Sequence, residues 1–388
     1  MNYPLSGLRV LDLTIARAGP TAVRHLADWG AEVIRIQAPV SLRGKDENLG
    51  EGHDYENLHR SKRCMSLNLK HAEGRDLFYK MVAGADVVVE NMRPDVKFSL
   101  GVDYDTLAAI NPGIVYGSIS GFGQSGPYRN DGGVDQIAQG LSGLMSITGF
   151  PGQGPVRTGL AIADMAAGNS LALAISMALF ERTKTGKGRW VHTSLLEALI
   201  HMMDFQASRW LMDKEVAFQV GNDHPTAAPT GTFPTADGHI NMAASSTRFF
   251  ERLCAIFGDR ALFEEPDYRT FKSRADHRVE LNKRVSAHTS RFTSVDLIAT
   301  LKEKGIPCGP IYTVDQTFAD PQVKSIGMAI TNPAEPDREY VASSLNFEGL
   351  ERRIFSAAPA IDEHTNDILK EFGISHEDAS RLRDNGVI

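Results

Sequence analysis

One acidic residue stands at the start of the longest apolar stretch of the sequence. The segment AIADMAAGNSLALAISMALFERTKTGKG, residues 161–188, carries no charge between Asp164 and Glu181. An aspartate just before a buried helix is a preferred N-cap that contributes about 1 kcal/mol. A carboxylate in such a place can also act as a nucleophile in acyl transfer. Asp164 is therefore a candidate for either role.

Glycines crowd the residues that precede Asp164, from Gly126 to Gly154. Glycine allows a backbone to approach a ligand closely, although ordinary turns use glycine as well. This clustering favours a ligand-binding region around Asp164, but the residues by themselves leave both of its roles open.

Motifs for other kinds of catalysis are missing where they would be expected. The first strand-to-helix turn, TIARAGPTAV, lacks the G-x-G-x-x-G pattern of dinucleotide binding, and no G-x-S-x-G serine motif occurs. The twelve histidines show no H-E-x-x-H or paired spacing, which argues against a catalytic metal. Three isolated cysteines form no C-x-x-C pair and are typical of a reducing compartment. We expect neither a metal nor a bound cofactor.

Composition and charge narrow the possible partners. The 388 residues carry a formal net charge of -7 and no basic block, so nucleic acid is not an expected partner. No charged leader precedes an apolar run at the N-terminus. Gly168, Asn169 and Ser170 interrupt the longest apolar segment, which favours a core helix over a membrane span. We expect a soluble, cytoplasmic protein without a membrane partner.

The first 125 residues alternate between apolar runs and helical patterns. Strand-like runs occupy residues 8–14, 31–36, 86–91 and 114–120, with helical patterns at 21–30, 74–85 and 105–113. Such alternation predicts an α/β fold with a parallel, Rossmann-like sheet and helices on its faces. From about residue 225, a hairpin around Asp237 and Gly238 and further helical patterns indicate a smaller α+β domain.

Several segments in order carry a resemblance to a known family. They are PLSGLRVLDLT, AGPTAVRHLADWGAEVIRI, SLNLK, DVVVENMRP, GGVDQIAQGLSGLMSITG and GLAIADMAAG, followed by ERTKTGKG and LKEKGIPCGPI. Together they resemble the family III CoA-transferases, which include formyl-CoA:oxalate and carnitine CoA-transferases. The resemblance implies a large Rossmann-like domain over residues 1–200, a small α+β domain over 225–325, and a return segment, 326–388, that completes the large domain. It also implies an interlocked homodimer.

The resemblance places the family's nucleophilic aspartate on Asp164. Acyl-CoA and a small carboxylic acid would be the substrates, so coenzyme A enters as a substrate and not as a resident cofactor. The family's CoA-contacting segments fall on Arg17, Ala18, Leu67, Asn68, Leu69, Lys70, Asn91, Met92, Arg93 and Asp135.

This sequence departs from the family pattern at two arginines and at a loop. Ala38 and Pro39 replace an arginine that often follows the second strand, and Ser99 stands where another CoA-facing arginine is found. The glycine-rich lid of the oxalate enzymes would fall near NMAASSTRFF and is absent, which does not favour oxalate or formate as substrates. Charge for the CoA phosphates could come instead from Arg35, Arg43, Arg93 or Lys97.

An aspartate suits the exchange of a thioester between two acids. At an ordinary pKa of about 3.9 it is ionised at neutral pH and needs no general base. Two alternatives remain. The related α-methylacyl-CoA racemases carry a histidine where Val134 stands, and valine cannot abstract a proton. A non-catalytic acyl-CoA-binding protein would keep the CoA segments without needing Asp164.

Overall fold

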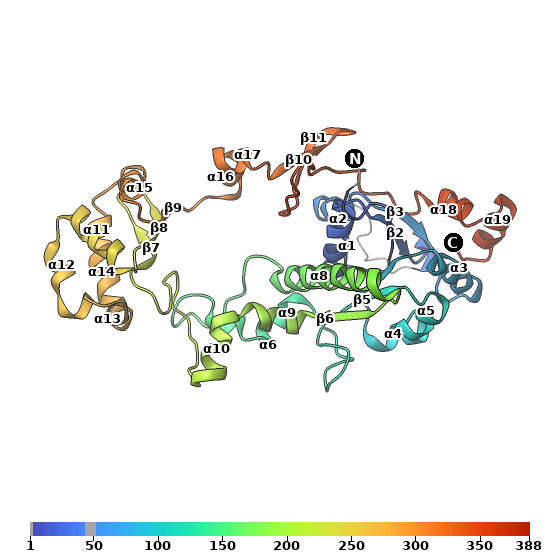
Figure 1. The fold of residues 1–388 in the computed structure, drawn as a ribbon, viewed down its shortest axis with the longest axis horizontal. Coiled ribbons are helices and arrows are strands. Elements are labelled where there is room, and N and C mark those ends of the chain that lie inside the picture. Colours follow the sequence, from blue (N-terminus) through green and yellow to red (C-terminus); the bar gives the residue numbers. More distant parts are fainter. Residues whose placement is uncertain (1–2, 43–51) are drawn as a thin grey trace. The chain divides into compact units, whose positions relative to one another are not determined.

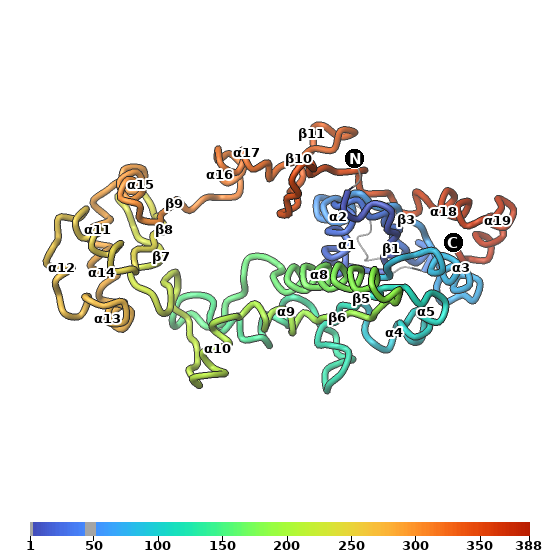
Figure 2. The backbone as a smooth tube through the Cα atoms, viewed as in Figure 1, coloured from blue at the N-terminus to red at the C-terminus, as the bar shows by residue number. Residues whose placement is uncertain are grey.

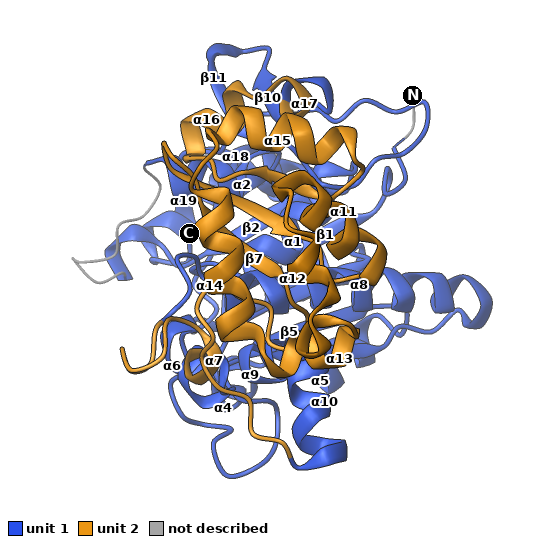
Figure 3. Ribbon diagram, turned by 90° about the vertical axis from the view of Figure 1, so that its left-hand side faces the viewer, with its two compact units in different colours: residues 1–144, 157–214, 324–388 blue, residues 145–156, 215–323 orange. Residues whose placement is uncertain are grey.

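The computed structural model describes residues 3–42 and 52–388 (Figure 1). The chain forms two compact units (Figure 3). Unit 1 comprises residues 1–144, 157–214 and 324–388, and unit 2 comprises residues 145–156 and 215–323. Unit 1 is therefore built from three separate stretches of the sequence.

A six-stranded sheet lies at the centre of unit 1, with strand order β3-β2-β1-β4-β5-β6 and every neighbouring pair parallel. The order turns outward in both directions from β1 and β4, which is the switch point of a doubly wound sheet. The predicted α/β class with a Rossmann-like parallel sheet is confirmed. The strands are β1 (Arg9–Asp12), β2 (Glu32–Gln37), β3 (Arg63–Ser66), β4 (Val87–Glu90), β5 (Val115–Ser120) and β6 (Trp190–Ser194).

Helices cover both faces of this sheet because successive strand residues point to opposite sides. Val10 packs with α1, α8 and α9, whereas its neighbour Leu11 packs with α3, α5 and the C-terminal helices α18 and α19. Figure 2 shows those last helices returning beside β3 and α3. The helices of unit 1 are α1 (Ala18–Asp28), η1 (Val40–Leu42), α2 (His53–His59), α3 (Ala72–Ala83), α4 (Pro94–Leu100), α5 (Tyr104–Ile110), α6 (Asp135–Leu141), α8 (Ile162–Thr185), α9 (Leu195–Met202), α10 (Asp204–Asp213), α18 (Thr365–Glu371) and α19 (His376–Asp384).

Helix α8 is the segment that starts with the candidate nucleophile. It ends where Gly186 adopts a left-handed conformation with φ of 69°, after the cations Arg182 and Lys184 in its last turn. Its length and composition would suffice to cross a membrane, and half of its apolar window is buried within the protein.

Close packing of α8 against α1 fixes the start of α8. An added Cβ on Gly168 would lie 2.7 Å from the Cβ of Thr21 and 2.8 Å from the carbonyl oxygen of Ala18. Glycine is needed here because α1 leaves no room for a side chain.

Unit 2 has its own antiparallel sheet, β7-β8-β9, and its own core around Phe233, Ile240 and Phe250. The predicted hairpin at Asp237 and Gly238 is confirmed, since β7 pairs antiparallel with β8 on either side of it. Its elements are β7 (Thr230–Pro234), β8 (His239–Ala243), α11 (Thr247–Phe257), α12 (Arg260–Glu264), η2 (Pro266–Tyr268), α13 (Phe271–Asp276), α14 (Arg278–Thr289), α15 (Ser294–Glu303), β9 (Cys308–Pro310) and α16 (Val314–Ala319). The short helices α7 (Leu144–Ile147) and α17 (Pro321–Ser325) span unit boundaries, and β10 (Ala329–Asn332) and β11 (Glu335–Val341) form a further hairpin in unit 1.

We predict that Gly168→Val destabilises the protein, because the new side chain would force α1 and α8 apart. Overpacking of this kind costs about 1–3 kcal/mol in the free energy of unfolding. Denaturant unfolding measures it, with Gly132→Val as the control, since nothing lies within 4 Å of a Cβ there. Equal stability of the two variants would contradict the packing described for the two helices.

Candidate active site

The predicted CoA-contacting segments all follow strands of the parallel sheet. Arg17 and Ala18 follow β1, residues 67–70 follow β3, and residues 91–93 follow β4. Parallel strands have their carboxyl ends at one edge, and ligands of doubly wound sheets bind there, at the switch point. The fold therefore brings these segments to one edge of the sheet.

A hollow of about 400 Å³ opens at this edge. Five of the ten predicted contact residues line it, namely Leu67, Asn68, Leu69, Lys70 and Met92. The remaining lining consists of Leu13, Ile15, Arg35, Ile36, Gln37, Ala38, Leu42 and Leu100. A mostly apolar hollow with a few polar groups is typical of a small-molecule site.

The C-terminal residues support one wall of this hollow. The backbone N–H of Asn68 donates to the carbonyl oxygen of Val387 at 2.7 Å, and its side-chain amide donates to that of Gly386 at 3.1 Å. The 67–70 turn is thus held by residues more than 300 positions away in the sequence. No local sequence pattern predicts that support.

Among the four cations suggested for the phosphates, Arg35 lies in the hollow. It is 5% exposed, and its guanidinium donates to the Tyr55 hydroxyl at 3.1 Å. Its Nε atom is buried without a hydrogen-bond partner among the described residues. Arg93 is exposed where α4 begins, and Arg43 lies outside the described residues.

The suggestion that Lys97 supplies phosphate charge is wrong. Lys97 is 1% exposed, and its ammonium donates to Glu90 at 3.2 Å and to Gln124 at 2.6 Å. Glu90 in turn accepts the backbone N–H of Met92 at 2.8 Å. Lys97 therefore neutralises a buried carboxylate that shapes the 91–93 turn.

Asn91 joins the two loops that meet at the switch point. Its side-chain oxygen accepts the backbone N–H of Ile15 at 2.9 Å, and its amide donates to the carbonyl oxygen of Ile15 at 2.8 Å. The next residue, Ala16, has a left-handed φ of 58°, which is rare for a residue with a Cβ. Asn91 does not line the hollow, and its amide is used to hold the loop before Arg17 in this conformation.

A buried ion pair at the end of β1 supports the loop that precedes Arg17. Asp12 and Lys62 are both fully buried, with 2.9 Å between their charged atoms. The other oxygen of Asp12 accepts the backbone N–H of Thr14 at 2.9 Å and its hydroxyl at 2.5 Å. Sequence reasoning missed both residues, because a strand-end aspartate and a lysine 50 positions later carry no motif.

Asp164 is the third residue of α8 and is not its N-cap. The N-cap is Ala161, which has no side-chain hydrogen bond to the helix. Within residues 3–42 and 52–388, no hydrogen bond or ion pair engages the half-buried Asp164 carboxylate. The capping role considered for Asp164 is therefore wrong, and its oxygens are available for chemistry.

The cap is supplied by Asp135, from the start of α6. One oxygen of Asp135 accepts the backbone N–H of Ala163 at 2.8 Å, and the other accepts the side-chain amide of Gln139 at 2.7 Å. Arg157 lies 3.5 Å from this second oxygen. Asp135 is 8% exposed and does not line the hollow.

Burial, one carboxylate and one cation set the electrostatics of Asp164. Burial, and then the negative charge of Asp135, raise the pKa of Asp164 from 3.8 to about 6, whereas Arg17 lowers it. Arg17 is itself paired with Asp54 at 2.6 Å, and Ala18 is buried as the first residue of α1. The ordinary pKa expected from the sequence is therefore too low. At pH 7 about nine-tenths of Asp164 is ionised.

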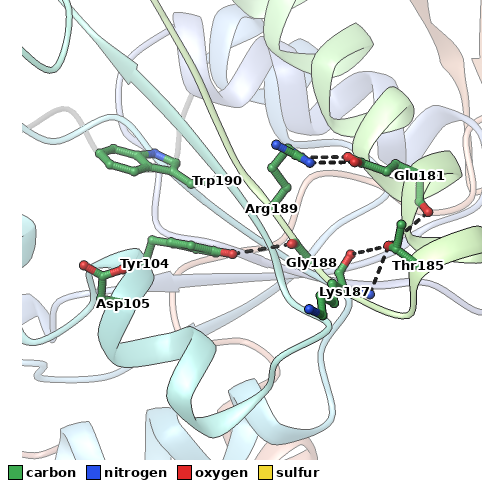
Figure 4. A pocket seen from close by; sticks show the side chains of 8 residues that line it. All are labelled: Tyr104, Asp105, Glu181, Thr185, Lys187, Gly188, Arg189 and Trp190. Atoms are coloured by element: carbon green, nitrogen blue, oxygen red, sulfur yellow. Dashed lines mark hydrogen bonds and ion pairs between the residues drawn. The ribbon is translucent and has the colours of Figure 1, made fainter.

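A second hollow, of about 520 Å³, lies at the other end of α8 (Figure 4). There Arg189 donates to both oxygens of Glu181, at 2.7 and 2.6 Å, and the Tyr104 hydroxyl donates to the carbonyl oxygen of Gly188 at 3.4 Å. Glu181 is about 25 Å along the helix axis from Asp164, at 1.5 Å per residue. This hollow is thus separate from the candidate active site.

Comparisons with known proteins identify the family of the chain. The sequence model of CoA-transferase family III matches residues 5–365. The chain is 35% identical to the succinate–glutarate CoA-transferase of Agrobacterium fabrum (strain C58), over 95% of each chain. It is 31% identical to the succinyl-CoA–D-citramalate CoA-transferase of Chloroflexus aurantiacus, over 99% of this chain and 98% of that one.

A solved structure shows the same fold. The CAIB/BAIF family protein from Brucella suis superimposes with a TM-score of 0.82 at 33% identity, over 96% of this chain and all of that one. The family model, these relatives and the shared fold show that the chain belongs to CoA-transferase family III and is an enzyme of that family.

Proposed function

We propose that the enzyme moves CoA from an acyl-CoA to a carboxylic acid through covalent intermediates on Asp164. The observation that carries this proposal is the state of Asp164. It is a half-buried carboxylate with no hydrogen bond from the described residues, while a neighbouring carboxylate caps its helix. A carboxylate kept free in this way suits a nucleophile better than a structural cap.

Two exchanges at carbonyl carbon account for the first half of the reaction. An oxygen of ionised Asp164 attacks the thioester carbonyl, the C–S bond breaks, and CoA leaves as thiolate, which gives an aspartyl-acyl anhydride. The thiolate then attacks the aspartyl carbonyl carbon and releases the first acid as its carboxylate. The product is an Asp164–CoA thioester, and no proton needs to move.

The second acid reverses these two steps. Its carboxylate attacks the Asp164–CoA thioester and expels CoA thiolate, and the thiolate then takes the new acyl group from the anhydride. Asp164 is regenerated as a carboxylate. Shielding from water is required because an anhydride hydrolyses readily, and the apolar start of α8 supports such shielding.

The names of the relatives suggest the substrates. Those at 31–35% identity are named for succinate, glutarate and D-citramalate. We propose succinyl-CoA as donor and a small dicarboxylic acid as acceptor. Val134, at the N-cap of α6, offers no base for proton abstraction, so racemisation is not favoured.

CoA binding is assigned to the hollow at the sheet edge. Arg35 and Lys70 supply cations for the phosphates, and the apolar lining accommodates the rest of the nucleotide portion. The positive charge of Arg17 acts on Asp164, whose pKa it lowers, and the same charge attracts the anionic substrates.

The interlocked homodimer and the cytoplasmic location stay proposals. Large apolar side chains are exposed along one side of α8, at Leu173, Met177 and Phe180, and on α10 at Leu211 and Met212. Exposed apolar patches of this kind are typical of surfaces that a second subunit covers.

We predict that Asp164→Ala and Asp164→Asn lose transfer by about 10³-fold or more, because nothing replaces a covalent nucleophile. Label exchange between free acid and acyl-CoA, followed by mass spectrometry, measures the rate. Circular dichroism confirms that each variant is folded. A variant with a tenth of the wild-type rate would rule out Asp164 as the nucleophile.

The pKa of Asp164 predicts two opposite pH effects. The carboxylate is the reactive form, so kcat/KM should fall as pH drops through about 6.

The free energy of unfolding should change with pH in the opposite direction. The raised pKa means that the folded state favours the protonated form, so ionisation destabilises the protein as pH rises from about 4 to about 6. Asp164→Asn should therefore be more stable than the wild type at pH 8, by about 1 kcal/mol in the free energy of unfolding after solvent screening, and its Tm should be higher there. Below about pH 4 the variant should show no gain in stability. A flat rate profile between pH 5 and 7 would contradict the electrostatics described.

Lys70→Gln should raise the KM for acyl-CoA about fivefold or more with little change in kcat, since a hydrogen bond to a charged group contributes about 1–3 kcal/mol. Lys184→Gln, an exposed lysine at the far end of α8, serves as the charge-matched control. Equal KM values in the two variants would remove Lys70 from the CoA site.

A further inference from the structure

Asp135 uses both of its oxygens within the protein. One accepts the Ala163 N–H, and the other accepts the Gln139 amide and faces Arg157. A carboxylate with these three partners and 8% exposure has little left to offer a substrate. The CoA contact that the family resemblance implies for Asp135 does not follow from this geometry.

Gln139 extends the same network to the segment that precedes α8, residues 157–161, which is called the strap below. It is fully buried, and its side-chain oxygen accepts the backbone N–H of Thr158 at 3.0 Å and the Thr158 hydroxyl at 3.3 Å. Its amide also lies 3.3 Å from the carbonyl oxygen of Leu160. Asp135 and Gln139, one turn apart on α6, thereby tie down the residues that lead directly into Asp164.

We propose that Asp135 is a positioning residue for the Asp164 nucleophile: it occupies the N-terminus of α8, fixes the strap before it, and places a second negative charge beside Asp164. The proposal rests on the proposed function, in which Asp164 forms the covalent intermediates. Its content is that the role of the Asp135 side chain is electrostatic and geometric, and that this carboxylate makes no contact with CoA.

The helix N-terminus explains why this matters. Its free N–H groups stabilise a nearby anion, and an aspartate in the first turn would ordinarily become a weaker base and a weaker nucleophile. Asp135 accepts one of those N–H groups and repels the charge on Asp164, and both effects oppose this loss. A more basic carboxylate attacks a thioester faster once it is ionised.

The other charged groups around Asp164 do not cancel this effect. Arg17, at the start of α1, opposes it, but Arg17 is paired with Asp54 of α2. Arg157 lies 3.5 Å from Asp135 and is 46% exposed, so solvent screens its charge. Burial and the charge of Asp135 stay the two largest influences on Asp164.

Asp135→Asn removes the charge and keeps the cap of α8. Asparagine keeps the volume and one oxygen that can accept the Ala163 N–H, whereas its amide nitrogen, a donor, cannot accept the hydrogen bond from Gln139. The low-pH limb of kcat/KM should move down by about 0.5 pH unit or more. Above pH 8, kcat should fall about two- to threefold, because the ionised nucleophile is less basic. The KM for acyl-CoA should stay within about twofold of the wild type.

Two further variants keep the test decisive. Asp135→Ser is a smaller neutral acceptor that should shift the limb in the same direction, and it replaces Asp135→Asn if the latter fails to fold. Asp131→Asn removes a charge from an exposed residue four positions earlier and should leave the profile unchanged.

An unmoved pH profile with a raised KM for acyl-CoA in Asp135→Asn would overturn the proposal in favour of a direct CoA contact. An unmoved profile with an unmoved KM would overturn it as well, because the charge would then have no effect. Neither result contradicts the proposed function, because that function is contradicted only if Asp164→Ala retains transfer.

Discussion

The close approach of α1 and α8 is the constraint on which the site depends. Gly168 lies against Thr21 and the carbonyl of Ala18, so the N-terminal part of α8 packs directly against the N-terminal part of α1. Arg17 precedes α1 and Asp164 lies in the first turn of α8. This packing therefore fixes the position of the loop before Arg17 relative to Asp164, the proposed nucleophile, and a larger residue at Gly168 would separate them.

Two buried ion pairs hold the loops that follow β1 and β4. Asp12 with Lys62, and Glu90 with Lys97, are ion pairs at the ends of β1 and β4. Unpaired, each charge would be costly in the interior, and paired they fix the turns that follow. The loops at the switch point are thus held from inside the protein, which leaves their outer surfaces free for a ligand.

The sequence predicted the elements better than it predicted the roles of individual side chains. The parallel sheet followed from apolar runs alternating with helical patterns, and residues 67–70 and Met92 do line the hollow. The cap of α8 could not be predicted, because it comes from Asp135, 28 residues before the amide that it accepts. The raised pKa of Asp164 was missed for the same reason, since burial and the neighbouring charge arise only when α6 and α8 meet. Lys97 looked like a surface cation because its partners lie 7 and 27 positions away.

The central claim is that Asp164 exchanges an oxygen with the substrates. During turnover with an acceptor acid whose carboxylate carries ¹⁸O, CoA thiolate takes the acyl group from the anhydride and leaves the bridging oxygen on the enzyme. The peptide that contains Asp164 should therefore gain one ¹⁸O atom, detected by mass spectrometry after proteolysis, and Asp135 should gain none. A transferase that turns over under these conditions without label in Asp164 would contradict the account.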